Sequence, residues 1–344
     1  MEISPANGAT ARQRVLPISD ASGAADARRA VAALAASLEF DETTAGELAL
    51  AVTEAATNIA KHAREGAIVA RILPCQEGGG IEVLAIDKGP GMDVAASMRD
   101  GHSTSGTPGS GLGALSRVAS GLDIWSRPGA GTLMRFEVWP KALARNGAPR
   151  LASGVICTEK RGEDVCGDNW ALLQGRGRVI AFVVDGLGHG LDAATAARAA
   201  VETVKSKSHL DAVDLMDAVH GALRPTRGAA AAIAMLQPES ELCTFCGVGN
   251  IAASIRGGGT SRSMVSHNGT LGHSVRRVQD FSYPFPKGSL LVMHSDGMAT
   301  HWDLAAYPGI ELRHPSMIAA ALFRDHSRGR DDLPVLTLRN GAGR

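Results

Sequence analysis

Four aspartate-containing motifs in the second half of the chain could together bind metal ions. In chain order they are Gly-Asp at Asp168, Asp-Gly at Asp185, Ser-Asp-Gly at Asp296 and Asp-Asp at Asp331 and Asp332. In three of the four, the aspartate adjoins an apolar segment typical of a strand. Strand ends converge readily, and clustered carboxylates repel one another unless hard cations lie between them. One Asp-Gly pair usually marks only a turn, but the ordered set favours a paired Mg²⁺ or Mn²⁺ site that activates water for attack on a phosphoester.

A second set of polar residues, in the first half, has the spacing of one helix face. Glu54, Asn58 and His62 fall at i, i+4 and i+8, beside an apolar stripe that begins at Leu48. A row of polar residues along one side of a helix is often only the face that contacts water. These three residues alone therefore do not distinguish a site from a surface.

Two glycine-containing motifs follow that helix. Asp87-Lys-Gly89-Pro-Gly91 comes directly after an apolar strand. A carboxylate at a strand end can accept an adenine amino group, and the glycines let the backbone turn close to the base. The run GTPGSGLG at 106–113 opens a helix, which offers backbone amides and a positive helix end to phosphates. A lone glycine-rich loop is weak evidence, but three motifs in this order indicate a nucleotide pocket.

The elements that must position these residues follow from the hydrophobic pattern. In the first segment we expect helices over 24–38, 41–63 and 110–119, and strands over 68–73, 81–86, 122–126 and 132–139. Asp41 or Thr43 could cap the second helix. Two helices, a sheet and a final hairpin predict an α/β sandwich with one sheet face covered.

The second segment starts after a polar, turn-rich stretch at 141–153, which predicts a domain boundary. The expected division is a nucleotide-binding domain over 12–140, a linker over 141–152 and a second domain over 153–340. In the second domain, an apolar strand over 179–184 leads to Asp185, and an Ala-rich helix over 191–205 follows. The chain as a whole is thus expected to be α/β (α+β).

The three motifs of the first segment closely resemble the GHKL ATPase fold over about residues 12 to 140. The resemblance is greatest to the small anti-sigma-factor serine kinases of the RsbT and SpoIIAB type. It implies that Glu54 is the catalytic carboxylate, which would orient and deprotonate a serine hydroxyl while Mg²⁺ neutralises the phosphates of ATP. The residues it implies for ATP and its magnesium are Asn58, Asp87, Gly89, Gly91, Gly109, Gly111, Gly113 and Thr132. There is no phospho-acceptor histidine domain, which disfavours a sensor histidine kinase, and His62 is expected to be structural.

The four aspartate motifs resemble the bacterial PPM-type serine/threonine phosphatases of the SpoIIE and RsbX group, from Leu151 to Arg339. The resemblance implies an αββα sandwich. It also implies the metal ligands Asp168, Asp185, the carbonyl of Gly186, Asp296 and Asp331, with Asp332 as the alternative to Asp331. The chain departs from this family at Pro334, where a threonine is usual. Proline removes a ladder donor, so that strand is expected at a sheet edge or bulged there.

The composition restricts the classes of partner that the chain is expected to bind. Lys+Arg and Asp+Glu both number 35, so the chain lacks the basic excess that nucleic-acid binding needs. No signal peptide is recognisable before Arg14, and the apolar run at 179–184 is too short to span a bilayer. We therefore expect a cytoplasmic protein that binds neither nucleic acid nor membrane.

The cysteines are scattered and odd in number: Cys75, Cys157, Cys166, Cys243 and Cys246. This fits a reducing compartment. Cys243-x-x-Cys246 lies in a strand-like segment with no second pair at zinc spacing, so two buried structural thiols are expected rather than a metal or redox site.

The two resemblances imply opposed chemistries on related substrates, because such kinases phosphorylate small STAS-domain proteins and such phosphatases remove that phosphate. The leading hypothesis is a partner-switching regulator of stress or stressosome signalling that dephosphorylates STAS-domain proteins. Two alternatives stay open: a phosphatase controlled by a non-catalytic nucleotide sensor, and an anti-sigma factor that sequesters a sigma subunit. A homodimer is expected from the resemblance to GHKL domains.

Overall fold

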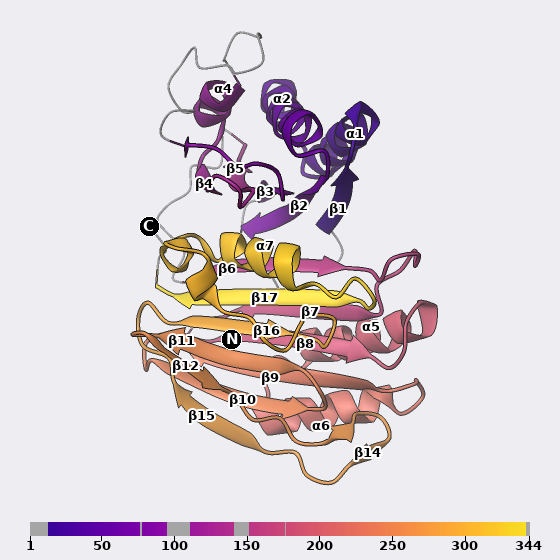
Figure 1. Ribbon diagram of the computed structural model, residues 1–344. Helices are drawn as coiled ribbons and strands as arrows, with labels where there is room; N and C mark the ends of the chain where they lie inside the picture. The colour runs from indigo at the N-terminus through magenta and orange to yellow at the C-terminus, as the bar shows by residue number, and fades with distance from the viewer. Residues whose placement is uncertain (1–12, 76–77, 95–110, 141–150, 176, 342–344) are drawn as a thin grey trace. The chain divides into compact units, whose positions relative to one another are not determined.

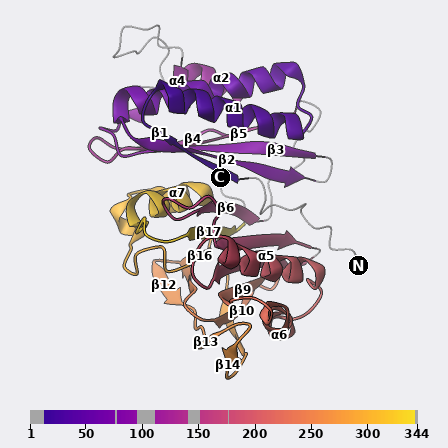
Figure 2. The same cartoon turned by 90° about the vertical axis from the view of Figure 1, so that its right-hand side faces the viewer.

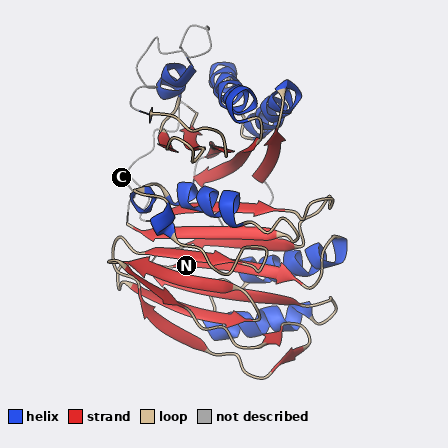
Figure 3. Cartoon of the chain, viewed as in Figure 1, coloured by secondary structure: helices blue, strands red, loops and turns tan. Residues whose placement is uncertain are grey.

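The computed structural model describes residues 13–75, 78–94, 111–140, 151–175 and 177–341 of the 344-residue chain. The chain divides into two compact units, the first comprising Ala11–Gly147 and the second containing Ala148–Arg344 (Figure 1). Among the described helices, none combines the length and the apolar character needed to cross a bilayer. Each unit has its own sheets and helices (Figure 3).

The first unit is one five-stranded sheet with helices on one face (Figure 2). Its strands are β1 (Gln13–Ile18), β2 (Gly66–Cys75), β3 (Gly78–Asp87), β4 (Asp123–Ser126) and β5 (Thr132–Val138), in the order β1-β2-β3-β5-β4 with every neighbouring pair antiparallel. The helices are α1 (Ala21–Ser37), α2 (Glu42–Asn58) and α4 (Gly111–Val118). The predicted α/β sandwich is confirmed, although strand β1 was not among the predicted strands.

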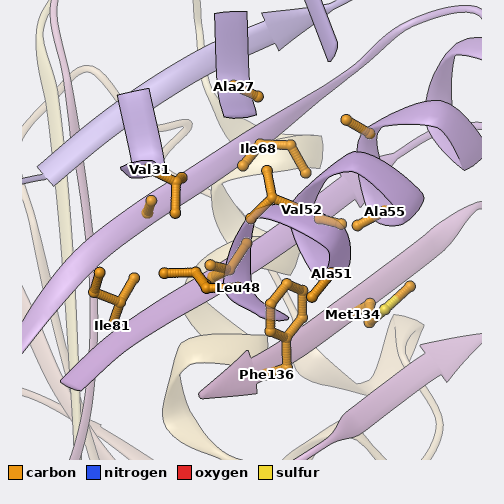
Figure 4. Packing of buried hydrophobic residues seen from close by; sticks show 14 of the residues in the cluster. Ala27, Val31, Leu48, Ala51, Val52, Ala55, Ile68, Ile81, Met134 and Phe136 are labelled. Atoms are coloured by element: carbon orange, nitrogen blue, oxygen red, sulfur yellow. The ribbon is translucent and has the colours of Figure 1, made fainter. Parts of the chain in front are cut away.

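Helix α2 begins and packs as its sequence predicts. The Asp41 side chain accepts a hydrogen bond from the Thr44 amide at 3.0 Å, which satisfies one of the free donors of the first turn. Its apolar face packs into the core against the sheet (Figure 4). The labelled core residues are Ala27, Val31, Leu48, Ala51, Val52, Ala55, Ile68, Ile81, Met134 and Phe136. Each fully buried Leu, Val or Phe side chain contributes about 1.5–3 kcal/mol to folding.

The predicted single helix over 41–63 is wrong at its C-terminal end. Regular α-helical structure stops at Asn58, and Ile59–Ala63 form a π-helical turn. The turn closes with a hydrogen bond from the Arg64 amide to the Ile59 carbonyl at 3.0 Å, and Arg64 has a left-handed φ of 65°. A π turn holds more residues per turn than an α-helix. The i, i+4, i+8 face therefore extends through Glu54 and Asn58 but not regularly to His62.

The second unit contains two five-stranded sheets. The first has the order β15-β10-β9-β8-β7, built from β7 (Asp168–Gln174), β8 (Val179–Gly186), β9 (Ala229–Gln237), β10 (Leu242–Val248) and β15 (Asp280–Pro284). The second has the order β12-β11-β16-β17-β6, built from β6 (Leu151–Thr158), β11 (Ala252–Gly257), β12 (Thr260–Ser263), β16 (Leu290–His294) and β17 (Leu333–Asn340). A small pair is formed by β13 (Gly269–Thr270) and β14 (Ser274–Val275).

Helices cover both sheets of this unit on the outside. Helices α5 (Leu191–Ser206) and α6 (Ala212–Leu223) pack on the first sheet, and α7 (Pro315–His326) packs on β6 and β17 of the second (Figure 1). Short 3₁₀ turns lie at Leu304–Ala306 and Ile310–Leu312. One core lies between the two sheets and another lies between the first sheet and its helices. The expected αββα sandwich is confirmed.

Several alanines lie in the core layer between α5 and the first sheet. The alanines of this layer are Ala196, Ala197 and Ala200 on the helix, with Ala171, Ala229 and Ala231 on the sheet, and they pack among larger side chains such as Phe182 and Val201. Because alanine carries only a methyl group, helix and sheet backbones can approach closely without leaving a void.

The C-terminal strand differs from its prediction at Pro334. Strand β17 lies between β16 and β6, so it is not an edge strand of its sheet. Pairing with β16 stops at His294 and Val335, whereas pairing with β6 continues through Pro334 and Cys157. The proline therefore has a neighbouring strand on one side only, which explains how an inner strand tolerates a residue without an amide donor.

Candidate functional site

Two of the predicted metal ligands face each other across neighbouring strands. Asp168 begins β7, Asp185 lies near the end of β8, and the antiparallel register pairs these two residues directly. Residues in direct register project to the same face of a sheet. The Asp168 side chain is buried and that of Asp185 is partly buried, and the two carboxyl groups lie close enough to repel each other. Two like charges are thereby held together in a position with little water.

The other two predicted ligands come from the second sheet. Asp296 follows β16, and Asp331 precedes β17. Both carboxylates act electrostatically on Asp185, so strand ends from the two sheets bring these groups to the same site. Asn250 donates a hydrogen bond from Nδ2 to Oδ2 of Asp296 at 2.8 Å, which orients that carboxylate. The sequence pattern did not identify Asn250 as part of the site.

Gly186 lies where its backbone leaves no space for a side chain. A Cβ at this position would collide with the carbonyl oxygen of Ala193 on α5 and would lie 2.8 Å from the carbonyl oxygen of Gly167. The Gly186 amide donates to that same Gly167 carbonyl at 3.2 Å. The backbone after Asp185 is therefore fixed by close packing against the loop before Asp168.

Asp332 has a different role from the one its position beside Asp331 suggests. Its side chain is buried, and its two oxygens accept hydrogen bonds from the backbone amides of Lys160 at 2.8 Å and Gly167 at 2.9 Å. Both oxygens are thus already bound to the loop that leads into Asp168. This favours Asp331 over Asp332 as the metal-facing carboxylate, with Asp332 holding the loop.

The pKa values of Asp168 and Asp185 are raised because both carboxyl groups are at least partly buried and lie near other carboxylates. Burial raises the pKa of Asp168 well above its ordinary value, and the nearby Asp185 carboxylate raises it further. Burial, followed by repulsion from Asp296, raises the pKa of Asp185 to about 7. Such a set of oxygen donors, costly to ionise when alone, fits hard divalent cations such as Mg²⁺ or Mn²⁺.

In the first unit, the residues expected around adenine come together at the ends of β3 and β5. Asp87 pairs in register with Thr132, and Oδ1 of Asp87 accepts hydrogen bonds from the amides of Gly89 at 2.8 Å and Thr132 at 3.2 Å. The Ser126 hydroxyl lies 3.0 Å from that of Thr132 and donates to the Gly131 carbonyl. The bonds from the Gly89 and Thr132 amides hold the Asp87 carboxyl at the strand end.

Gly91 lies on the same turn and has a positive φ of 70°. A Cβ there would collide with the carbonyl oxygen of Arg127, so only glycine fits this turn. Glu54 and Asn58 lie half-buried one helical turn apart at the end of α2. Their closeness to a bound nucleotide stays a prediction.

The expected phosphate loop is only partly described. Gly109 lies outside the described residues, while Gly111 and Gly113 fall in the first turn of α4. A separate cavity of about 490 Å³ lies between α1 and α2, with Arg28, Thr57 and Lys61 among its lining residues. It includes none of the predicted nucleotide-binding residues.

The cysteines of the Cys-x-x-Cys segment do not form a shared site. Cys243 belongs to the core between the two sheets, and Cys246 to the core beneath α5 and α6, so they lie on opposite faces of β10. Burial raises the pKa of each thiol to about 12. The prediction of a strand with two structural thiols is confirmed.

Comparison with known proteins identifies both units. Residues 19–137 match the family model "Histidine kinase-like ATPase domain", and residues 175–339 match "Stage II sporulation protein E (SpoIIE)". Serine/threonine-protein kinase RsbT of Bacillus subtilis (strain 168) is 32% identical over 107 residues, which are 31% of this chain and 80% of RsbT. Phosphoserine phosphatase RsbX of the same organism is 27% identical over 145 residues, which are 42% of this chain and 73% of RsbX.

A solved structure described as "The bacterial stressosome: a modular system that has been adapted to control secondary messenger signaling" matches with a TM-score of 0.53 and 27% identity. The match covers 56% of this chain and all of that one. Fold, site and comparisons together define a metal-dependent serine/threonine phosphatase of the PPM type fused to an ATPase-like domain. The chain belongs to the histidine kinase-like ATPase family of RsbT through its first unit and carries a SpoIIE-type phosphatase domain as its second.

Proposed function

We propose that the second unit removes phosphate from phosphoserine or phosphothreonine of small STAS-domain proteins, and that the chain regulates a partner-switching pathway of the stress or stressosome type. The observation that carries the phosphatase chemistry is the convergence of Asp168, Asp185, Asp296 and Asp331 from the strand ends of two sheets. The similarity to RsbX and to a stressosome structure supports the choice of substrate class.

In this proposal the metal ions are bound by the four aspartates and the Gly186 carbonyl. Two Mg²⁺ or Mn²⁺ ions at such a site supply a water of lowered pKa and neutralise charge on the phosphoryl group. The protein's own contribution is to hold the ligands in place. Asn250 orients Asp296, and Asp332 fixes the loop in front of Asp168 through two backbone amides.

We assign to the first unit the binding of ATP with Mg²⁺ and the phosphorylation of the same class of STAS-domain protein. Asp87 would accept from the adenine amino group, Asn58 would hold Mg²⁺, and Glu54 would act as the base toward the serine hydroxyl. The 32% identity to the kinase RsbT supports this assignment. A regulatory nucleotide sensor controlling the phosphatase is the competing function of this unit, since the same pocket could bind ATP without transferring phosphate.

The phosphatase proposal is tested with purified full-length protein, Mn²⁺ and a phosphorylated STAS-domain protein encoded in the same operon. Wild type should release phosphate and Asp185→Asn should not. Asp217→Asn, which makes the same chemical change at an exposed position on α6, is the matched control and should stay active. If neither wild type nor Asp217→Asn releases phosphate although Mn²⁺ binds, the phosphatase proposal is wrong.

The kinase assignment needs a separate assay. Radiolabelled ATP and the unphosphorylated STAS-domain protein should give a phosphorylated product with wild type and none with Glu54→Gln. If wild type gives no product but ATP changes its phosphatase rate, the first unit is a sensor. If a product forms equally with wild type and Glu54→Gln, the role of Glu54 is wrong.

A further inference from the structure

Arg227 lies beside the loop that follows the proposed metal ligands Asp185 and Gly186, and it belongs to none of the aspartate motifs. It precedes β9, whose first residues pair with the end of β8: Ala229 with Gly186, and Ala230 with Asp185. The register therefore places Arg227 two residues from the strand position that faces a proposed metal ligand. It is an exposed residue on the short connection between α6 and β9.

The guanidinium group of Arg227 lies over the loop that follows Asp185. A Cβ built on Gly188 of this loop would be 3.4 Å from Nη1 of Arg227. Nη2 of Arg227 forms an ion pair with Oδ2 of Asp192, in the first turn of α5, at 2.6 Å. The two side chains are 54% and 62% exposed. An ion pair this exposed contributes little to stability, so Asp192 is a partner that another anion could replace.

The backbone that carries Arg227 is held firmly. Its carbonyl lies 2.8 Å from Nε2 of His273, and the Thr226 hydroxyl accepts from the amide of Gly228 at 3.0 Å. The amide of Leu187, directly after Gly186, donates to the Gly228 carbonyl at 3.0 Å. The connection before β9 is thus tied directly to the loop of the metal site.

We propose that Arg227 binds the phosphoryl oxygens of the substrate at the metal site and exchanges Asp192 for them. A guanidinium presents two parallel N–H donors, which match two oxygens of a phosphate group. The aspartates that bind the metals repel a phosphate dianion, and a cation beside them offsets part of this repulsion. The inference rests on the proposed phosphatase function and adds a residue that recognises the phosphate itself.

The test compares Arg227→Ala with Arg224→Ala in the full-length chain. Arg224 is also exposed, lies three residues earlier at the end of α6 and carries the same charge, so the pair controls for net charge. With Mn²⁺ and para-nitrophenyl phosphate, Arg227→Ala should raise KM, and the inhibition constant for inorganic phosphate, by about tenfold, the lower end for a charge-assisted bond. The KM and inhibition constant of Arg227→Lys should fall between those of wild type and Arg227→Ala, because lysine keeps the charge but lacks the two parallel N–H donors.

Two further readouts separate phosphate binding from a structural role. The Mn²⁺ concentration for half-maximal activity and the melting temperature should stay at their wild-type values in Arg227→Ala. Calorimetric binding of inorganic phosphate to the Mn²⁺-loaded protein should weaken by the same factor without any turnover. This experiment tests Arg227 even if the wild type proves inactive, which would count against the proposed function instead. Equal phosphate affinity in Arg227→Ala and Arg224→Ala would overturn the proposal.

Discussion

Replacing Asp185 by asparagine should stabilise the metal-free protein while abolishing its metal-dependent activity. In the folded chain this carboxyl is buried, faces Asp168 and is repelled by Asp296, which raises its pKa from the ordinary 3.8 to about 7. An asparagine keeps the shape of the side chain and removes the charge. The repulsion that metal ions would otherwise neutralise then disappears.

The magnitude follows from the two pKa values. Between about pH 4 and pH 7 the folded state binds a proton at Asp185 that the unfolded state has lost, so stability falls as the pH rises through this window. Above pH 7 the cost reaches at most about 4 kcal/mol, at 1.36 kcal/mol for each unit between the two pKa values. Near pH 5 it is less than about 2 kcal/mol by the same relation. An asparagine side chain does not ionise in this range, so the stability of the variant should not fall in this way as the pH rises.

Thermal denaturation in EDTA at pH 5, 6, 7 and 8 measures the effect. Relative to Asp185→Asn, the wild type should lose roughly 5 to 10 °C in melting temperature between pH 5 and pH 8. Asp217→Asn, on an exposed helix surface, should parallel the wild type. Added Mn²⁺ should reverse the order by stabilising wild type alone. Parallel pH profiles for wild type and Asp185→Asn, or a variant less stable than wild type at pH 8 without metal, would refute the reasoning.

Three other substitutions test separate parts of the structure. Gly186→Ala should lower the free energy of unfolding by about 1–3 kcal/mol and remove Mn²⁺-dependent activity, because the added Cβ collides with the Ala193 carbonyl. Gly221→Ala, whose Cβ meets nothing within 4 Å, is the control. Both variants are compared with wild type by denaturation and by activity. Asp87→Ala should weaken ATP binding at least about tenfold by calorimetry, since the expected acceptor for adenine is lost; unchanged affinity would place adenine elsewhere. Leu48→Ala should lower the free energy of unfolding, measured by urea denaturation, by about 2–5 kcal/mol, because this side chain is fully buried in the core of the first unit. A decrease under about 1 kcal/mol would contradict the packing.

The fold was predictable where the sequence carries a local signal. The apolar run before Asp185 and the apolar face of α2 from Leu48 each specify an element without reference to the rest of the chain. The motif order then fixed the expected fold of both units. The π turn after Asn58 was not predictable, because a local helical pattern continues through it and only tertiary packing selects the wider turn.

The candidate site was predictable in its aspartates and incomplete in their surroundings. Asn250 and Asp332 act through hydrogen bonds to groups 46 and 165 residues away in sequence, which no spacing pattern reveals. The only local signal for Asn250 was its place as a polar residue in the short turn between β10 and β11. Arg227 gave no signal, since a single exposed arginine is common and its significance depends on the register between β8 and β9.

The alanine layer between α5 and the first sheet has a consequence for how the second unit can vary. Alanine loses no rotamer entropy when it is buried, so this layer forms at a lower entropic cost than a core of long side chains. Truncating one of these alanines to glycine removes only a methyl group, so the loss of buried apolar surface is small. Enlargement is the sensitive direction, because an added methylene must separate two backbones already in close approach. Since Ala193 of α5 packs against the Gly186 backbone, such a separation would also alter the packing beside the proposed metal ligands.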